Sequence, residues 1–282
     1  MLSATIFSAL FVFIIAFALL QSAELVLSTK SISELLFTSS WHPNRGDFGF
    51  YPFIVGTLSV TAIAMALAIP ICLLCAIYLA EYAPSRIRGI LKPPIDLLAG
   101  IPSVVYGLWG VLLIVPLIRN YLAPLAGVSS SGYSVLAGGF VLAIMVFPII
   151  ISVSDEVFRS VPSEVRVASF ALGATKWQTV KHVVVRKGMA GFIAAVALAF
   201  SRAFGETMAV LMVVGNVAKV PSSVFDPAYP LPALIANNYG EMMSLPLYES
   251  ALMLAALILL LVVAFFSIAA RMILVRVEKR SA

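Results

Sequence analysis

Charged side chains are scarce in this chain. Only 11% of its 282 residues are Asp, Glu, Lys or Arg, whereas 62% are hydrophobic and the mean hydropathy is +1.07. A soluble domain is roughly 45–50% apolar and about 25% charged, so this chain has too few polar residues to cover a globule in water. The composition excludes a soluble enzyme, a nucleic-acid-binding protein and a disordered chain, and it predicts a membrane protein.

Metal ligands and nucleophiles are scarce as well. Cys72 and Cys75 form a C-x-x-C inside an apolar run, which is either a redox or metal pair or two small side chains packing on a membrane helix. The two histidines, His42 and His182, fall on opposite sides of the predicted membrane. No G-x-x-x-x-G-K-[ST] run is present to cradle nucleotide phosphates. We therefore expect no catalytic residue, metal site or cofactor in this chain, and any energy source must be a partner.

Long apolar runs dominate the sequence instead. A membrane-spanning helix needs about 20 mostly apolar residues. The first such run has no basic N-terminal region and is longer than the apolar part of a signal peptide, so we expect it to be retained. The sequence predicts an all-α integral membrane protein with six transmembrane helices, at about 2–26, 53–79, 95–117, 135–153, 189–214 and 251–275.

Basic residues are divided unequally between the two sides of these spans. Thirteen of the eighteen Lys and Arg residues lie in the loops after the second and fourth spans and in the C-terminal tail. The positive-inside rule places these segments, and so both termini, in the cytoplasm. Residues 1–52 then hold the first helix and first outer loop, 53–275 hold the membrane core with a long outer loop at 215–249, and 276–282 form a cytoplasmic tail.

Two opposite charges lie inside the fifth predicted span. Arg202 and Glu206 are four residues apart, so on one helix they share a face and can pair. Ionisable groups in a membrane are costly, so we expect this pair to line a polar pathway in which the Arg202 guanidinium binds an oxyanion. A buried structural ion pair is the alternative. Asp96, near the start of the third span, is either another pathway charge or an interfacial structural carboxylate.

The third predicted span is interrupted by residues that weaken a helix. A broken helix at membrane depth is tolerated where its backbone lines a cavity, and there Ser103 and Tyr106 offer hydroxyl groups. Close helix packing through the glycines is the alternative. The interrupting residues are Gly100, Pro102, Gly107 and Gly110.

The segment 155–187 is too long and too regularly patterned to be a simple connector. Pro162 can open a helix, Gly173 can end it, and a second helix is predicted from Lys176. The predicted helix–turn–helix, at about 160–187, lies on the cytoplasmic side with its apolar face either in a groove of another protein or on lipid. On the second helix that face is predicted to hold Trp177, Val180, Val183 and Val184.

The run VPSEVRVASFALGATKWQTVKHVVV in this segment resembles the EAA loop of ABC-transporter permeases, the element that docks into the nucleotide-binding subunit. The usual pattern is R-E-A-A-x-A-L-G-A-T-x-W-x-T. This chain departs from it with Val167 at the Glu position, Ser169 at the second Ala position and Arg186 at the usual final Pro. The resemblance implies that coupling to an ATPase falls on Glu164, Arg166, Ala168, Ala171, Gly173, Ala174, Thr175 and Trp177.

Four further runs resemble the phosphate-specific (Pst-type) permeases, and the PstC subunit more than its PstA partner: FGFYPFIVGTLSVT, AIYLAEYAP, LLAGIPSVVYGLWGV and SRAFGETMAVLMVVGN. This resemblance implies the ABC transporter type-1 permease fold and a non-catalytic inner-membrane subunit. It also implies a PstA-like partner permease, a PstB-like ATPase dimer that uses ATP and Mg, and a phosphate-binding protein received by the outer loops at 41–51 and 226–241. The family's charged positions in the fifth span fall on Arg202 and Glu206.

Three alternatives stay open at this point. A sulfate or molybdate permease shares the coupling loop, but it is not expected to carry GIPSVVYG and GETMAVLMVVGN together. An ion-coupled secondary transporter needs more intramembrane carboxylates and usually internal repeats. A membrane-embedded enzyme needs a cluster of Asp, His or Ser at the interface.

Overall fold

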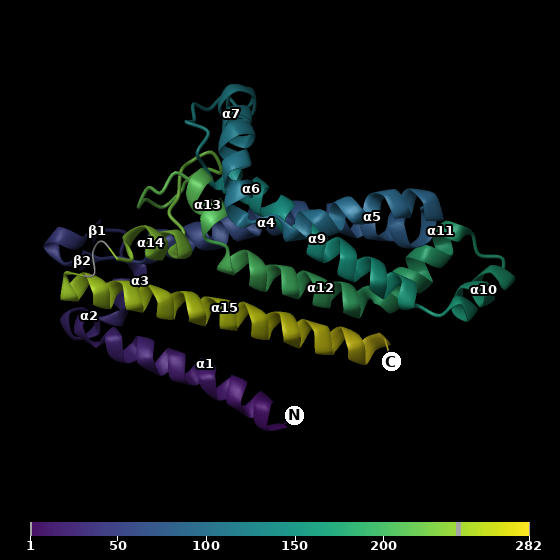
Figure 1. Ribbon diagram of the computed structural model, residues 1–282, viewed down its shortest axis with the longest axis horizontal. Helices are drawn as coiled ribbons and strands as arrows, with labels where there is room; N and C mark the ends of the chain where they lie inside the picture. The colour runs from purple at the N-terminus through teal and green to yellow at the C-terminus, as the bar shows by residue number, and fades with distance from the viewer. Residues whose placement is uncertain (1, 241–243, 282) are drawn as a thin grey trace.

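The computed structural model describes residues 2–240 and 244–281, and it consists almost entirely of helices (Figure 1). Four long helices lie side by side: α4 packs on α9, α9 on α12, and α12 on α15, while α1 lies against the outer side of α15. Their bounds are α1 Leu2–Ser22, α4 Tyr51–Ile77, α9 Val135–Ser160, α12 Val185–Gly205 and α15 Pro246–Ser281.

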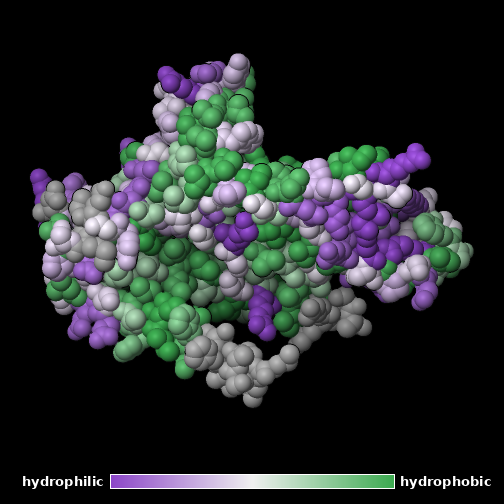
Figure 2. Space-filling model, viewed as in Figure 1, coloured by the Kyte–Doolittle hydropathy of each residue, from purple (hydrophilic) through white to green (hydrophobic). Residues whose placement is uncertain are grey.

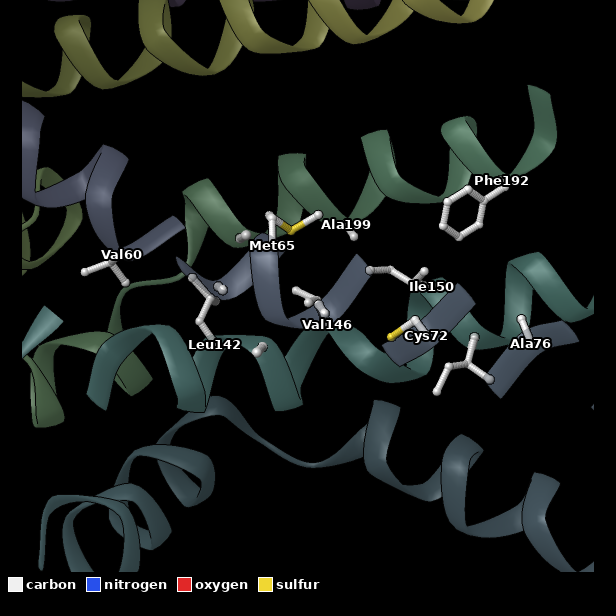
Figure 3. Close-up of a cluster of buried hydrophobic side chains, with 14 of the residues drawn as sticks. Val60, Met65, Cys72, Ala76, Leu142, Val146, Ile150, Phe192 and Ala199 are labelled. Carbon is white, nitrogen blue, oxygen red and sulfur yellow. The ribbon is translucent and has the colours of Figure 1, made fainter. Parts of the chain in front are cut away.

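The interface between α4, α9 and α12 forms the main core (Figure 3). Small residues recur every four positions along one face of α4, and the larger side chains of α9 and α12 fill the space beside them. Small residues allow helices to approach closely in lipid, where van der Waals packing holds helices together. Cys72 is completely buried in this core and Cys75 is half-buried, with both thiols free, as the packing interpretation of the C-x-x-C predicts. The buried α4 face comprises Val60, Ala64, Ala68, Cys72 and Ala76.

Short elements cover one end of the bundle. They are α2 Glu24–Thr29, α3 Ile32–Phe37, the antiparallel strands β1 Trp41–His42 and β2 Asp47–Phe48, and α14 Leu231–Asn238. The Trp41 ring packs edge-on against Phe48, Phe50 and Phe53 at centroid distances of 5.4, 5.6 and 4.7 Å. The Lys30 ammonium lies 2.7 Å from Asp47. The predicted first outer loop is therefore a folded cap. Glu241, at the end of the second predicted outer region, lies outside the described residues.

At the opposite end of the bundle lie α5 Ser85–Gly100, α10 Ser163–Ala171 and α11 Lys176–Thr179. Figure 2 shows hydrophobic side chains over the middle of the molecule and hydrophilic ones gathered over this end. The π-helical turn Tyr78–Tyr82 extends α4 into this region, and Val180–Val184 joins α11 to α12. An apolar middle between polar ends is expected of a helix bundle that crosses a bilayer.

Within the described residues, five helices are long and apolar enough to cross a membrane. Helix α1 contributes a shorter apolar stretch, Leu10–Ser22, so the predicted total of six spans stays a prediction. The five are Tyr51–Tyr82, Ser103–Leu125, Val135–Ser160, Lys176–Gly205 and Pro246–Val277.

The third and fifth predicted spans differ most from the structure, where they run over Ser103–Leu125 and Lys176–Gly205. The third span begins at Ser103 rather than near residue 95, because the chain breaks at Ile101 and Pro102 and the preceding residues form the separate helix α5. The fifth span ends at Gly205 rather than near residue 214, because the chain breaks again at Glu206. The residues after that break form α13 Met208–Val213.

The third span is itself segmented. It comprises α6 Ser103–Trp109, α7 Val115–Leu117 and α8 Ala123–Leu125, joined by π-helical turns at Gly110–Ile114 and Ile118–Leu122. In Figure 1 this span projects from the middle of the bundle, away from the direction of the four long helices. Its base, α6, packs against α13, so the two chain breaks face each other.

Candidate functional site

Four of the five predicted pathway residues lie at or near two chain breaks, one before α6 and one after α12. Ile101 and Pro102 are extended, with ψ of 130° and 141°, and Glu206 is extended with ψ of 121°. Pro102 causes the first break, because proline lacks an amide donor and disfavours helical backbone at the preceding residue. Interrupted membrane helices of this kind form substrate sites near the bilayer midplane in many transporters.

Tyr106 and Arg202 lie beside these breaks, on α6 and in the last turn of α12. The Tyr106 hydroxyl donates a hydrogen bond of 2.7 Å to the backbone carbonyl of Leu98, which bridges the break between α5 and α6. The Arg202 guanidinium, in the last turn of α12, is close enough for its charge to act on the Tyr106 hydroxyl. Ser103 is the half-buried first residue of α6. The two hydroxyl groups therefore lie on α6 just after the first break, and the Arg202 cation lies on α12 just before the second.

The predicted pairing of Arg202 with Glu206 was wrong. The rule that residues four apart share a face holds only on a continuous helix, and α12 ends at Gly205. Glu206 turns away and accepts a hydrogen bond of 3.4 Å from the Ala209 amide, which supports the start of α13. In the described part of the chain Arg202 is exposed and forms no ion pair or hydrogen bond. Its guanidinium donors are therefore available to an anion.

Glu206 lies against the wall formed by α4. The half-buried carboxylate shares a small void with Thr57, Val60 and Thr61 of α4. Thr57 donates to Phe53 O at 2.7 Å and accepts from the Leu231 amide at 2.9 Å, so it fastens this wall to the cap. Sequence reasoning missed these two threonines, because hydroxyl groups in apolar helices usually bond only to their own backbone.

Asp96 stands apart from the other predicted pathway residues. It is exposed on α5 and lines a cleft of about 770 Å³ with Arg88, Lys92 and Arg159. None of the other predicted pathway residues lines this cleft. This location favours the interpretation of Asp96 as an interfacial carboxylate.

The predicted helix–turn–helix forms at the polar end. Helix α10 ends in a Schellman turn: Gly173 has a φ of +84°, its amide donates to Phe170 O, and the Ala174 amide donates to Ser169 O. Thr175 and Gln178 then form a capping box that opens α11. Local sequence signals alone specify this turn, which we call the coupling hairpin (residues 163–179).

Most of the predicted coupling residues are exposed, and large apolar side chains lie among them. Glu164, Ala168, Ala171, Gly173 and Thr175 are exposed, and Ala174 is half-buried. The apolar face predicted for the second helix is divided in the structure: Val180 and Val184 are buried within the chain, whereas Trp177 is exposed among the described residues. The exposed apolar side chains are Val167 (64%), Phe170 (47%), Leu172 (89%) and Trp177 (56%).

Arg166 differs from its neighbours because it points inward. Its guanidinium forms an ion pair with Glu81, with 2.7 Å between Nη2 and Oε1. Sequence reasoning missed Glu81, whose only local signal is a carboxylate just beyond an apolar span. The hairpin therefore has an exposed apolar surface and an inward-facing ion pair.

These features are the organisation of a transport permease. Over residues 2–240 and 244–281, the helical bundle has an unpaired cation near its two chain breaks, and an apolar hairpin lies uncovered at its polar end. The chain belongs to the binding-protein-dependent transport system inner membrane component family, which matches it over residues 68–280. It is thus a multi-pass, non-catalytic subunit of an ABC importer, with ATP hydrolysed by partner subunits and substrate delivered by a binding protein.

Curated relatives match nearly the whole chain. The phosphate transport system permease protein PstC of Xylella fastidiosa (strain Temecula1) is 35% identical over 279 residues, covering 94% of this chain and 85% of that protein. PstC of Pasteurella multocida is also 35% identical, covering 98% of this chain and 91% of that protein. The probable ABC transporter permease YqgH of Bacillus subtilis is 41% identical, covering 74% and 66%. These matches confirm the resemblance to PstC-type permeases.

Solved structures show the same fold at lower identity. An inward-facing structure of the MetNI methionine ABC transporter aligns with a TM-score of 0.60 and 18% identity, covering 79% of this chain and 93% of that one. A bacterial ABC transporter involved in import of the polysaccharide alginate aligns with a TM-score of 0.53 and 15% identity, covering 80% and 79%. The predicted type-1 permease fold is confirmed.

Proposed function

We propose that this chain is a permease subunit of an ATP-driven importer of inorganic phosphate. The observation that carries the substrate assignment is the similarity, over 94% of the chain, to a permease named for phosphate transport. The chain pairs with a homologous PstA-like permease and a PstB-like ATPase dimer, which uses ATP and Mg. A phosphate-binding protein docks on the outer face, and both termini lie in the cytoplasm.

The proposed phosphate path passes Arg202. Its exposed guanidinium supplies several N–H donors in a planar arrangement that suits an oxyanion, and Ser103 and Tyr106 offer hydroxyl groups on α6. Glu206 follows directly after the end of α12, and its carboxylate accepts a hydrogen bond from the Ala209 amide. Repulsion by this carboxylate favours release of the anion and keeps the site from trapping it.

The proposed contact with the ATPase is the coupling hairpin. An exposed apolar surface of this kind is typical of a protein interface, and a helix placed in a groove is a common mode of recognition. We assign ATPase coupling to the exposed hairpin residues around Gly173 and Trp177. On the opposite end, the cap around Trp41 and α14 receives the binding protein.

The test is uptake of radiolabelled phosphate by proteoliposomes that contain the full complex and its binding protein, with sulfate and molybdate as competitors. Arg202→Gln removes the charge and most donors, and loss of one charge-assisted contact worth about 1.5–3 kcal/mol predicts a fall of roughly 10- to 150-fold. Arg119→Gln is the matched control, since Arg119 is an exposed arginine at the far end of the projecting span.

Normal uptake by Arg202→Gln would remove Arg202 from the path. Preferential uptake of sulfate or molybdate would reassign the substrate while keeping the permease. Phosphate uptake that proceeds without ATP and responds to an ion gradient would contradict the ATP-driven mechanism itself.

A further inference from the structure

One guanidinium ties three segments together at the cytoplasmic end of the bundle. Arg166 of α10 reaches Glu81 Oε1 with Nη2 at 2.7 Å and Nε at 3.2 Å. Nη2 also donates to Phe158 O at 2.8 Å, and Nη1 donates to Val161 O. The two carbonyls belong to the end of α9, where helical carbonyls have no partner within their own helix. Arg166 therefore joins the coupling hairpin to α4 and to α9 at once.

The acceptor, Glu81, lies in the π-helical turn that ends α4. This turn is held from other elements too: Arg88 of α5 donates to Leu79 O at 3.0 and 2.6 Å, and the Lys176 ammonium lies 4.5 Å from the Tyr82 ring centre. Three cationic side chains from α5, α10 and α11 thus hold the last turn of α4. Movement of the hairpin relative to α4 must break these contacts or carry α4 with it.

The ion pair is largely shielded from water. The Arg166 and Glu81 side chains are 19% and 11% exposed, and they share two hydrogen bonds. Removing one member of a shielded pair leaves the other charge without its partner, so the pair resists separation. The neighbouring pair Asp155–Arg159 has similar chemistry, at 2.9 Å, but both members lie on α9, so it joins no two elements.

Helix α4 leads from this joint to the wall of the candidate site. It runs without interruption from Tyr51 to the turn that holds Glu81. Its buried face packs along α9 for most of its length, as the labelled side chains from Val60 to Ala76 show (Figure 3). Near its other end, Val60 and Thr61 line the void that also holds Glu206. A single helix therefore connects the hairpin with the region of the two chain breaks.

We infer that the Glu81–Arg166 ion pair is the joint that transmits displacement of the coupling hairpin to α4, and through α4 to the wall beside Glu206. This role rests on the proposed docking of the hairpin to an ATPase. Glu81 and Arg166 are positioning residues: neither needs to touch phosphate or ATP. Without the joint, the ATPase still docks and hydrolyses ATP, but α4 no longer follows the hairpin.

The first experiment measures ATP hydrolysed per phosphate imported in proteoliposomes of the full complex. Glu81→Gln keeps an acceptor oxygen but loses the charge, and Glu81→Ala loses both. Because substitutions along a coupling path change coupling roughly two- to thirtyfold, the ratio is expected to rise within that range, more for Ala than for Gln. Asp155→Asn is the matched control, with an unchanged ratio expected. Co-purification of the ATPase is measured for every variant.

An unchanged ratio in Glu81→Ala would overturn the inference. Loss of ATPase co-purification in Glu81→Gln would also overturn it, because Glu81 would then serve docking rather than transmission. An equal rise in Asp155→Asn would show that any charge lost at this end has the same effect, which also contradicts a specific joint.

A second experiment is independent of the transported ion. Spin labels at Ser163→Cys on α10 and Leu74→Cys on α4, both exposed positions, report the distance between hairpin and helix in a background with Cys72→Ala and Cys75→Ala. With Glu81 present, we expect one narrow distance with and without ATP, because the two elements move together. With Glu81→Ala, the distance should broaden or shift on ATP addition.

Identical distance changes in both backgrounds would refute the joint, even if phosphate uptake were normal. Conversely, a complex that imports another anion but keeps the expected distance behaviour would refute only the proposed substrate. The two failures are therefore distinguishable.

Discussion

Replacing Gly173 by Val is expected to weaken ATPase docking while the membrane bundle stays folded. Gly173 has a φ of +84°, a conformation that L-residues with a Cβ rarely adopt. A Cβ placed there meets no atom within 4 Å, so steric overlap with neighbours adds nothing to the effect. The whole cost of the substitution is backbone strain in the turn of the coupling hairpin.

The magnitude follows from that strain. The left-handed region costs an L-residue roughly 1–2 kcal/mol, with Asn the best tolerated and β-branched residues the worst. Because about 1.4 kcal/mol corresponds to tenfold, the population of the native turn falls roughly 5- to 30-fold. We expect ATPase binding to decrease in the order Gly173, then Gly173→Asn, then Gly173→Ala, then Gly173→Val.

The assay is titration of the ATPase against each purified variant in detergent, followed by co-purification. Gly127→Val is a matched control: Gly127 has a φ of +70°, a Cβ there also meets nothing within 4 Å, and it closes a Schellman turn after α8. Gly127→Val introduces the same backbone strain in a turn on the predicted outer side. Equal binding by the Asn and Val variants at Gly173, or an equal loss in Gly127→Val, would refute the reasoning.

Two further predictions concern packing and pH. Gly107→Ala places a Cβ 2.6 Å from Met212 Sδ and 3.1 Å from Ala209 Cα, so the Met212 side chain must move and the α13 backbone must shift slightly. Overpacking of this kind costs about 1–3 kcal/mol, so thermal unfolding in detergent should show a lower midpoint. Gly100→Ala is the control, because a Cβ there meets nothing within 4 Å and the midpoint should not change. The Ser222 hydroxyl and the amides of Ser222 and Ser223 donate hydrogen bonds to Asp226, which lowers the pKa of its carboxyl below the ordinary 3.8. The ionised carboxylate therefore stabilises the turn fully above pH 3.8. This stabilisation is lost as the pH falls from 3.8 through the lower pKa of the folded protein. Pepsin cleavage at 222–225 should therefore rise across that interval in the native protein, and a cleavage rate that does not change over it would contradict the assignment.

Local signals in the sequence predicted the coupling hairpin well. The break before Ser163 and the turn at Gly173 depend on residues within a few positions of each other, so proline and glycine specify them without help from the rest of the chain. The burial of Val180 and Val184 beside the exposed Trp177 was not predictable in the same way, because it depends on how the second helix packs against the bundle.

The candidate site was predicted in composition but not in geometry. Arg202, Tyr106 and Ser103 were selected because polar groups in apolar spans are conspicuous, and all three lie near the two chain breaks; their role in a pathway stays a prediction. The position of Glu206 relative to Arg202 was not predicted, because the helix break that separates them accompanies the packing of α13 on α6. The distance between Asp96 and this site likewise depends on the break at Pro102.

The scarcity and distribution of charge determined, without any structure, that this chain belongs in a membrane and which segments are expected on the cytoplasmic side. Burial of apolar surface and the positive-inside rule act on each segment separately, so composition is sufficient for both. Only the tertiary structure decided which charges meet. Glu81 and Arg166 are 85 positions apart, and they come within 2.7 Å because α4 packs along α9 and brings both helix ends to the coupling hairpin.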